Sequence, residues 1–262
     1  MAETPLDAAH AAMDANPGDD AARLRFYERL AESELVLMLS EEPKGDALSP
    51  EIFDLGDARF VLVFDREERL AQFAGKPVPY AALSGRALAR LAAEQAIGLA
   101  VNPEVAPSSI LLPPEALAWL VSTLEQDPQE ADVRVETLGA PGDLPDTLLG
   151  ALDRKLAAMA GLARKAYLAS VTYSDGTRGH LLGITGAVDG AEPALARAIQ
   201  EALVFSGLEA GALDVTFLGD ADPRAAELAR VALRFDLPEP PKVARQVMQP
   251  PGSDPEKPPI LK

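Results

Sequence analysis

The stretch from Gly98 to Trp119, GLAVNPEVAPSSILLPPEALAW, predicts a chain that folds back on itself. Ile97–Val101 is short and apolar, which is typical of a buried strand, and Asn102-Pro103 ends it because proline lacks the N–H that a ladder needs. Ser109–Leu112 has the same character and predicts a second strand. Pro114 then begins a helix, since proline is favoured at the first helical position. These prolines therefore have architectural roles as strand stop and helix start.

Further helices and strands are predicted before this stretch. They are a helix from Thr4-Pro5 to Asn16-Pro17-Gly18, a helix capped by Asp19 or Asp20 with Leu24, Tyr27, Leu30 and Ala31 on one face, and a buried strand at Leu35–Leu39. A hairpin at Ile52–Asp65 around Gly56-Asp57, a short helix through Phe73, and a helix at Gly85–Ala96 capped by Ser84 follow. We expect Asp65 to cap the short helix, because Glu68 stands three residues later, the spacing of a capping box.

The second half of the chain also alternates strands and helices. After a boundary near Asp127-Pro128, the predicted segments are strand Val133–Leu138, helix Asp146–Ala163, strands Tyr167–Tyr173 and His180–Thr185 joined at Asp175-Gly176, helix Pro193–Gly207, strand Leu213–Leu218, and a helix from Asp222-Pro223 through Leu233. This order is typical of helices packed on a mixed sheet. We therefore predict an α+β fold of two domains, each with helices packed on a mixed β-sheet.

The composition is that of a globular protein. The chain has 262 residues, 48% of them hydrophobic and 25% charged, which is enough for two ordinary domains with real cores. It contains no cysteine, which excludes disulfides, thiolate metal sites and a cysteine nucleophile. The amino-terminal residues lack the pattern of a secretory signal, and no run of about 18 apolar residues predicts a membrane helix. We therefore expect a soluble cytoplasmic protein.

The charge is strongly acidic and unevenly distributed. The net charge is −17, and residues 1–130 carry 23 acidic against 10 basic residues. Nucleic-acid binding requires lysine and arginine to neutralise phosphates, and the same repulsion disfavours an anionic membrane. We therefore expect no nucleic acid and no membrane among the partners. The charge serves solubility, and a basic protein partner is the alternative.

No combination of residues indicates a reaction or a metal site. The two histidines, His10 and His180, lie in different predicted domains, and no Gly-x-Ser-x-Gly, His-Glu-x-x-His or P-loop sequence occurs. The aspartates Asp54, Asp57 and Asp65 are spread over strands and a turn instead of a dense calcium loop. We predict no catalytic residues, no metal and no cofactor.

The sequence resembles the SseB-like proteins, the bacterial enhanced serine sensitivity family. In the first half the similar segments are FVLVFDREERLAQF (60–73), the helix after Leu83-Ser84-Gly85, and GLAVNP (98–103) followed by Ile110–Leu112 and a proline-started helix. In the second half they are LARKAYLASVTYSDGTRGHLLGI (162–184), the helix at 193–207, and LDVTFLG (213–219). The resemblance spans most of residues 20–237.

This resemblance implies an SseB N-terminal-like domain in residues 1–127 and an SseB C-terminal-like domain in residues 128–237. The remaining residues, 238–262, hold eight prolines and are predicted to be an extended, polyproline-like tail. The family brings no catalytic residues with it, and its name refers to a serine-related phenotype. Two departures stand out: Glu104 occupies a position where relatives commonly have glycine, and the second domain ends in RFDLPEPP instead of an aromatic terminus.

Two hypotheses about function follow, and an enzyme remains a third class. The first is a non-enzymatic protein-interaction or regulatory protein. The second is a small-molecule sensor linked to serine metabolism, with amino acids as candidate ligands. A pocket that gathers carboxylates with Arg178 or His180 would favour an enzyme instead. The predicted binding residues lie after the Asn-Pro stop, where ligands often meet α/β sheets, and are Asn102, Glu104, Ser108 and Ser109.

Overall fold

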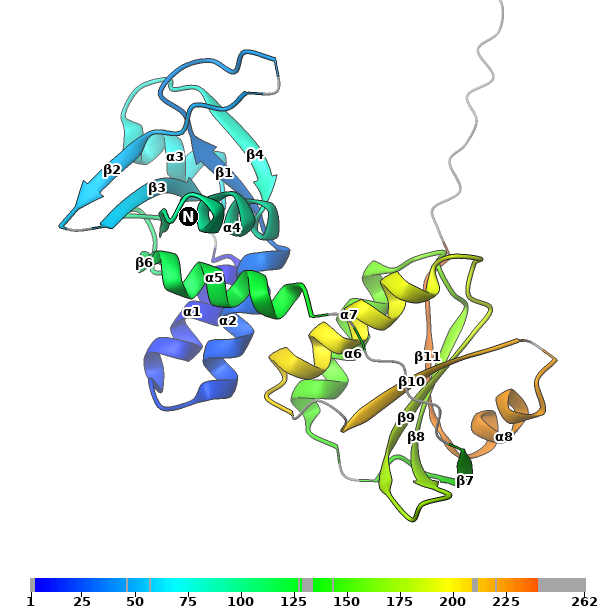
Figure 1. The fold of residues 1–262 in the computed structure, drawn as a ribbon. Helices are drawn as coiled ribbons and strands as arrows, with labels where there is room; N and C mark the ends of the chain where they lie inside the picture. Colours follow the sequence, from blue (N-terminus) through cyan, green and yellow to red (C-terminus); the bar gives the residue numbers. More distant parts are fainter. Residues whose placement is uncertain are drawn as a thin grey trace, which may run out of the picture.

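The computed structural model describes residues 3–239 except 46, 57, 127, 129–133, 143, 209–211 and 220. In this part of the chain there are two mixed β-sheets, one in each half, with eight helices packed on them (Figure 1). The predicted two-domain α+β fold is confirmed. The domain boundary predicted near 127 falls among residues outside the described ones, and so does the tail from residue 240 onward.

The first sheet has six strands. They are β1 (Glu34–Met38), β2 (Ile52–Leu55), β3 (Ala58–Phe64), β4 (Tyr80–Ser84), β5 (Gly98–Val101) and β6 (Ile110–Leu112). The strand order is β4-β1-β3-β5-β6, and β2 pairs with β3 outside this path. β3 and β5 run parallel, while the other pairs are antiparallel. The strand–stop–strand prediction for residues 97–112 is therefore confirmed as β5 and β6.

Helices cover the two faces of the first sheet unequally. α1 (Pro5–Ala15), α2 (Asp20–Glu32), α4 (Gly85–Glu94) and α5 (Pro114–Leu124) share one core with Leu37, Val63 and Leu99. On the opposite face the described residues place one helix, the short α3 (Glu67–Ala74), whose Leu70 packs with Leu62 and Phe64. Neighbours such as Val63 and Phe64 serve different cores because successive strand residues point to opposite faces.

The second half repeats the layering with five strands and three helices among the described residues. The elements are β7 (Val135–Gly139), α6 (Asp146–Ala158), β8 (Lys165–Tyr173), β9 (Arg178–Thr185), α7 (Glu192–Phe205), β10 (Leu213–Leu218), α8 (Pro223–Val231) and β11 (Leu233–Asp236). The sheet order is β10-β9-β8-β11, and β7 also pairs with β8. α6 and α7 share the larger core, α8 packs on the other face, and α6 and α7 are turned toward the first half (Figure 1).

Four details differ from the sequence-based expectations. Asp65 does not cap α3; the N-cap is Arg66, without a side-chain cap bond, because the Asp65 carboxylate binds Arg69 and Thr4 instead. The helix predicted to reach Ala163 ends at Ala158, ahead of a turn in which Gly161 has a left-handed φ of 80°. The last helix stops at Val231, because the following residues form β11 on β8. β4 was not predicted.

Candidate functional site

The four residues predicted to bind a ligand lie in the loop between β5 and β6 and differ in exposure. Asn102 and Ser108 are buried, and the Asn102 amide donates a 2.9 Å hydrogen bond to Ser108 Oγ. Glu104 and Ser109 are exposed, and the Glu104 N–H donates to Ser109 Oγ at 3.3 Å. The first pair therefore holds the loop together from inside, whereas ligand binding by Glu104 and Ser109 stays a prediction.

Asn102 and Ser108 belong to a buried set of polar side chains that we call the inner network: Thr4, Asp7, Asp65, Arg69, Asn102 and Ser108. The Arg69 guanidinium, 2% exposed, donates to both carboxylate oxygens of Asp7 and at 2.8 Å to Asp65. The Ser108 hydroxyl also donates to Asp7, and the Asn102 side-chain oxygen accepts from the Asp65 N–H at 3.1 Å. These bonds join α1, α3 and the β5–β6 loop.

The inner network is an ion cluster that keeps its charges at neutral pH. Burial by itself raises the pKa of Asp7, but hydrogen bonds from Arg69, Ser108 and Thr4 outweigh it and hold this pKa far below the ordinary value. The hydrogen bonds that Arg69 donates to Asp7 raise the pKa of Arg69 despite its burial. Neither group supplies an acid or a base near neutral pH, so the cluster serves to anchor α3.

The face of the first sheet that carries α3 is covered only in part. Four large side chains on it are exposed: Phe53 (51%), Leu55 (47%), Leu111 (45%) and Tyr80 (41%). In register, these four pair with members of the α3-side core, namely Phe60, Ala58, Ala100 and Met38 respectively. Because paired residues point to the same face, the four exposed side chains form one surface, which we call the open face.

The open face runs over the edge strands β2, β4 and β6. Its floor is flat beside β5, because Gly98 has no side chain and the Phe60 ring occupies that space; a Cβ on Gly98 would lie 2.5 Å from two ring atoms. The β2–β3 hairpin extends away from the second half (Figure 1). The surface is therefore apolar and not covered by the described helices.

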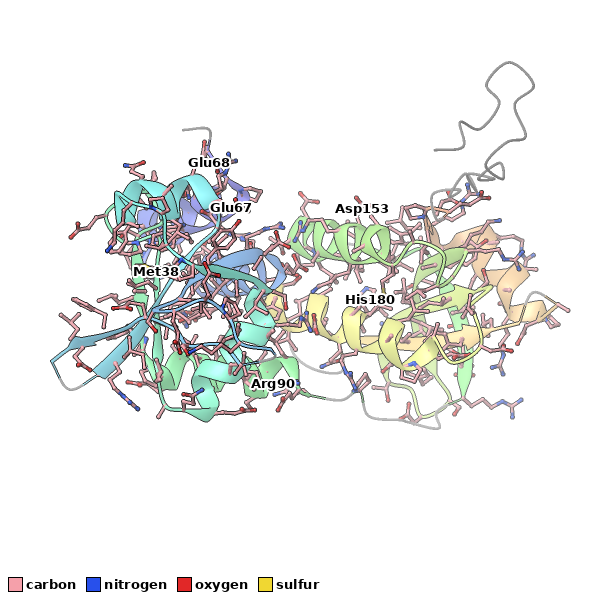
Figure 2. All side chains as sticks on the ribbon, turned by 90° about the horizontal axis from the view of Figure 1, so that it is seen from above. Met38, Glu67, Glu68, Arg90, Asp153 and His180 are labelled. Carbon is pink, nitrogen blue, oxygen red and sulfur yellow. The ribbon has the colours of Figure 1, made fainter. Side chains whose placement is uncertain are left out.

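Carboxylates border the open face near Tyr80. Hydrogen bonding to Glu67, at the start of α3, raises the pKa of the Tyr80 hydroxyl. Glu68 follows on the same helix, and the Glu51 N–H donates to the Met38 carbonyl at 3.0 Å. Figure 2 places Met38, Glu67 and Glu68 in the same region of the first half. The apolar surface thus has a negatively charged margin.

A second set of charged side chains, which we call the bridging network, joins the two halves: Glu28, Glu32, Arg86, Arg154, Lys155 and Glu201. The Glu201 carboxylate on α7 accepts two 3.0 Å bonds from Arg86 on α4 and one of 2.8 Å from Lys155 on α6. Lys155 also pairs with Glu32 at 2.8 Å, and Arg154 with Glu28 at 3.3 Å. Phe205, at the end of α7, lies within the core of the first half.

The bridging network combines a well-paired carboxylate, Glu201, with a poorly paired one, Glu28. Burial raises the pKa of Glu201, yet hydrogen bonds from Arg86 and Lys155 outweigh it and leave the pKa lowered. Burial, and then the charge of Glu32, raise the pKa of Glu28. One Glu28 oxygen, Oε1, has no hydrogen-bond partner in the described structure. Glu28 is therefore a buried carboxylate whose charge is poorly compensated.

The histidines are far apart and have structural neighbours. His10 meets the Phe26 ring edge-on at 5.8 Å between centroids, and His180 Nε2 lies 2.9 Å from the Pro141 carbonyl. Over the described ranges, no group of three or more His, Asp or Glu residues is arranged to hold a metal. The helices of those ranges include none with the length and apolar character to cross a membrane.

Sequence reasoning missed the residues that define this surface. The strand at residues 52–55, with the sequence IFDL, has apolar residues on both of its faces. A strand with one face in water alternates apolar and polar residues, so this pattern indicates an additional contact surface. Asp65 and Arg69 have the i,i+4 spacing of a helical ion pair, which indicates a role for Asp65 other than capping. No local pattern marks Glu201 or Lys155, because they pair with each other across 46 positions and with Arg86 and Glu32 of the first half.

Comparison with known families identifies the domain that bears the open face. Residues 6–119 match the family model described as the SseB protein N-terminal domain. This range begins in α1, ends in α5 and contains all six strands of the first sheet. No curated protein and no solved structure matches the chain significantly. Residues 6–119 of the chain therefore form an SseB N-terminal domain.

Proposed function

We propose that this chain is a non-enzymatic interaction protein that binds a protein partner through the open face. The observation that carries the proposal is the set of four large apolar side chains exposed on one sheet face, Phe53, Leu55, Tyr80 and Leu111. Large apolar side chains that are exposed on one sheet face mark an interaction site more often than single exposed residues scattered over the surface do. Aromatic side chains such as Phe53 and Tyr80 commonly supply most of the binding energy of an interface.

The charge of the surroundings favours one kind of partner. Glu51, Glu67 and Glu68 border the open face, and residues 1–130 carry 23 acidic against 10 basic residues. Electrostatic complementarity steers a partner of opposite charge and rejects one of the same charge. The partner is a protein segment with apolar side chains at its centre and lysine or arginine beside them.

The chemistry of the described polar clusters supports a non-enzymatic role. Two buried carboxylates with lowered pKa values, Asp7 and Glu201, are tied to arginine or lysine inside buried networks. A catalytic acid or base has to reach a substrate from a cleft. Neither group has that access.

Pull-down with matched variants tests the proposal. Phe53→Asp places a charge on the open face, while Val188→Asp does the same at an exposed apolar residue, 53% accessible, in the second half. We expect one protein to be retained by the wild type and by Val188→Asp but lost with Phe53→Asp. With the purified partner, Phe53→Asp should raise the dissociation constant about thirtyfold or more, the effect of an interface hot spot.

Two further arms identify other occupants of the open face. Light scattering of the wild type and Phe53→Asp detects self-association through this surface, and a chain truncated after Glu239 tests whether residues 240–262 cover it. A dimer that Phe53→Asp dissociates would identify a second copy of the chain as the occupant. A partner that binds only the truncated chain would identify residues 240–262 as the occupant of the open face in the full chain. Either result would replace the proposal. Equal retention of a partner by Phe53→Asp and Val188→Asp would refute the role of the open face.

The second candidate function, a small-molecule sensor, is favoured by a hollow of about 490 Å³ between the halves. It is lined by Arg86, Arg90 and Arg197 together with Glu125 (Arg90 is labelled in Figure 2). Its arginines suit the carboxylate of an amino acid, although Arg86 and Arg90 already pair with Glu201 and Glu125 and Arg197 is engaged as well. Calorimetry with serine and related amino acids tests this candidate. Absence of heat and of a melting-temperature shift at millimolar ligand would remove it.

A further inference from the structure

The described helices also leave one end of the second sheet uncovered, but the side chains exposed there are polar. Leu168 of β8 and Leu182 of β9 lie under α6 and α7 in the larger core. Because alternate residues share a face, the same face continues along β8 as Ser170 and Thr172. In register with these two are Gly139 and Thr137 of β7, and His180 and Arg178 of β9.

These residues form two rows across three strands and make the floor of a hollow. The rows are Thr137–Thr172–Arg178 and Gly139–Ser170–His180. The hollow has a volume of about 520 Å³ and is walled by the loop of residues 140–142. A carbonyl only accepts, so the 2.9 Å contact with Pro141 means that His180 Nε2 carries the proton and ties this loop to the sheet.

Two features shape the hollow. A β-bulge interrupts the β7–β8 register between Val135 and Thr137, and such bulges redirect the strand that carries them. Gly139 keeps the floor low, since a Cβ there would lie 2.9 Å from Ser170 Oγ. Both features leave the Ser170 hydroxyl accessible from the hollow.

The polar side chains of the hollow have unused hydrogen-bonding capacity. Within the described part of the chain, the Arg178 guanidinium and the hydroxyls of Ser170 and Thr172 have no hydrogen-bond or ion-pair partner. The described lining contains no carboxylate, although the chain carries a net charge of −17. In the hollow between the halves, by contrast, Arg86 and Arg90 are paired with carboxylates.

We propose that this hollow binds a small oxyanion, the phosphate or carboxylate group of a small molecule. Arg178 supplies the charge and a planar pair of donors that match two oxygens of such a group. The hydroxyls of Ser170 and Thr172, one from each row, donate to the remaining oxygens. This site is separate from the open face and uses the second half of the chain.

Calorimetry of the full chain with inorganic phosphate and, separately, with acetate tests the site at constant ionic strength. The matched variants are Arg178→Gln, in the hollow, and Arg224→Gln, an exposed arginine on α8 whose side chain has no partner among the described residues. We expect saturable millimolar binding of at least one anion. Arg178→Gln should raise the dissociation constant about tenfold or more, because a hydrogen bond to a charged group is lost.

The two anions distinguish the sources of the oxyanion. Tighter binding of phosphate indicates a phosphorylated ligand, and tighter binding of acetate indicates a carboxylic acid. The double variant Ser170→Ala with Thr172→Val should weaken binding about threefold or more, while Arg224→Gln should change it less than twofold. No saturable binding at tens of millimolar of either anion, or equal weakening by Arg178→Gln and Arg224→Gln, would overturn the proposal.

Discussion

The inner and the bridging networks use the same chemistry, carboxylates held by arginine or lysine, but differ in burial. Arg69, the cation of the inner network, is 2% exposed, and every contact joins parts of the first half. In the bridging network Arg86 and Arg154 are each 43% exposed, and its members come from both halves. The inner network is sealed inside one domain, whereas the bridging network lies at a boundary that water reaches.

This difference shows which contacts define the open face and which only connect the halves. Arg69 fixes the position of α3 on the sheet. The four side chains of the open face, which α3 does not cover, remain exposed. The partly exposed ion pairs of the bridging network are weakened by water and salt. The inner network therefore sets the extent of the open face, and the bridging network sets how firmly the second half is attached.

The largest expected effect comes from breaking the inner network. Arg69→Ala leaves Asp7 and Asp65 buried without their cation, which should lower the free energy of unfolding by about 3 to 5 kcal/mol. Urea unfolding measures the change. Arg66→Ala, three residues away and without a side-chain partner in the described structure, is the control and should change it by less than about 0.5 kcal/mol. Equal effects would show that Arg69 does not anchor α3.

A smaller effect is expected in the bridging network. Glu201→Gln removes the charge between Arg86 and Lys155, but Lys155 keeps Glu32 and Arg86 gains water. The expected loss in the free energy of unfolding is about 2 kcal/mol, against no measurable loss for the exposed Glu227→Gln on α8. If Glu201→Gln matched Arg69→Ala in urea unfolding, burial would not distinguish the networks.

Acid should act in opposite directions on Asp7 of the inner network and Glu28 of the bridging network. The pKa of Asp7 is held below its ordinary value, so its stabilisation is present above about pH 4 and is lost as the pH falls through the folded-state pKa. The pKa of Glu28 is raised, so its ionisation opposes folding, and this penalty is relieved as the pH falls through the raised pKa toward about 4.3.

Two isosteric variants separate these contributions in urea unfolding at about pH 7, 5 and 3. In the wild type, Glu28 should make the free energy of unfolding rise on mild acidification, and Glu28→Gln should abolish this rise. Asp7→Asn should lower stability at neutral pH and reduce the further loss below about pH 4. Identical pH profiles for the wild type and Glu28→Gln would contradict the poor compensation of the Glu28 charge.

The smallest expected effect concerns the loop that carries Asn102 and Ser108 of the inner network. Glu104 has a φ of 61°, a left-handed conformation that glycine adopts without the steric cost of a Cβ. Glu104→Gly should therefore raise the free energy of unfolding by up to about 1 kcal/mol, measured by urea unfolding. A loss of stability would mean that the Glu104 side chain makes a contribution larger than this strain.

Local patterns were sufficient for most of the fold. The helix predicted from Thr4-Pro5 forms as α1, the Asp175-Gly176 hairpin joins β8 and β9, and Pro114 opens α5. β4 and β11 were not predicted, because their residues are partly exposed on both faces and show no clear alternation of apolar and polar residues. They are strands because they pair with β1 and β8, which lie far away in the sequence. The SseB resemblance of the first half is confirmed over residues 6–119.

The candidate site could be predicted from the sequence only in small part. Asn102 and Ser108 were predicted as binding residues, but their place in the inner network depends on Asp7, which lies 101 positions from Ser108 in the chain. Exposure of Phe53 and Leu111 depends on how far α3 reaches across the sheet, and Arg69 fixes that position from within. Such long-range contacts leave no periodic signal in the sequence.

Photo-cross-linking from the open face tests the interaction most directly. A photoreactive phenylalanine analogue is placed at Phe53 in one chain and at Val188 in another, since both side chains are about half exposed. Irradiation in native lysate should give one discrete adduct from position 53, to a protein segment rich in apolar and basic residues, and none from position 188. The absence of an adduct at position 53, or the same adducts from both positions, would contradict a binding role for the open face.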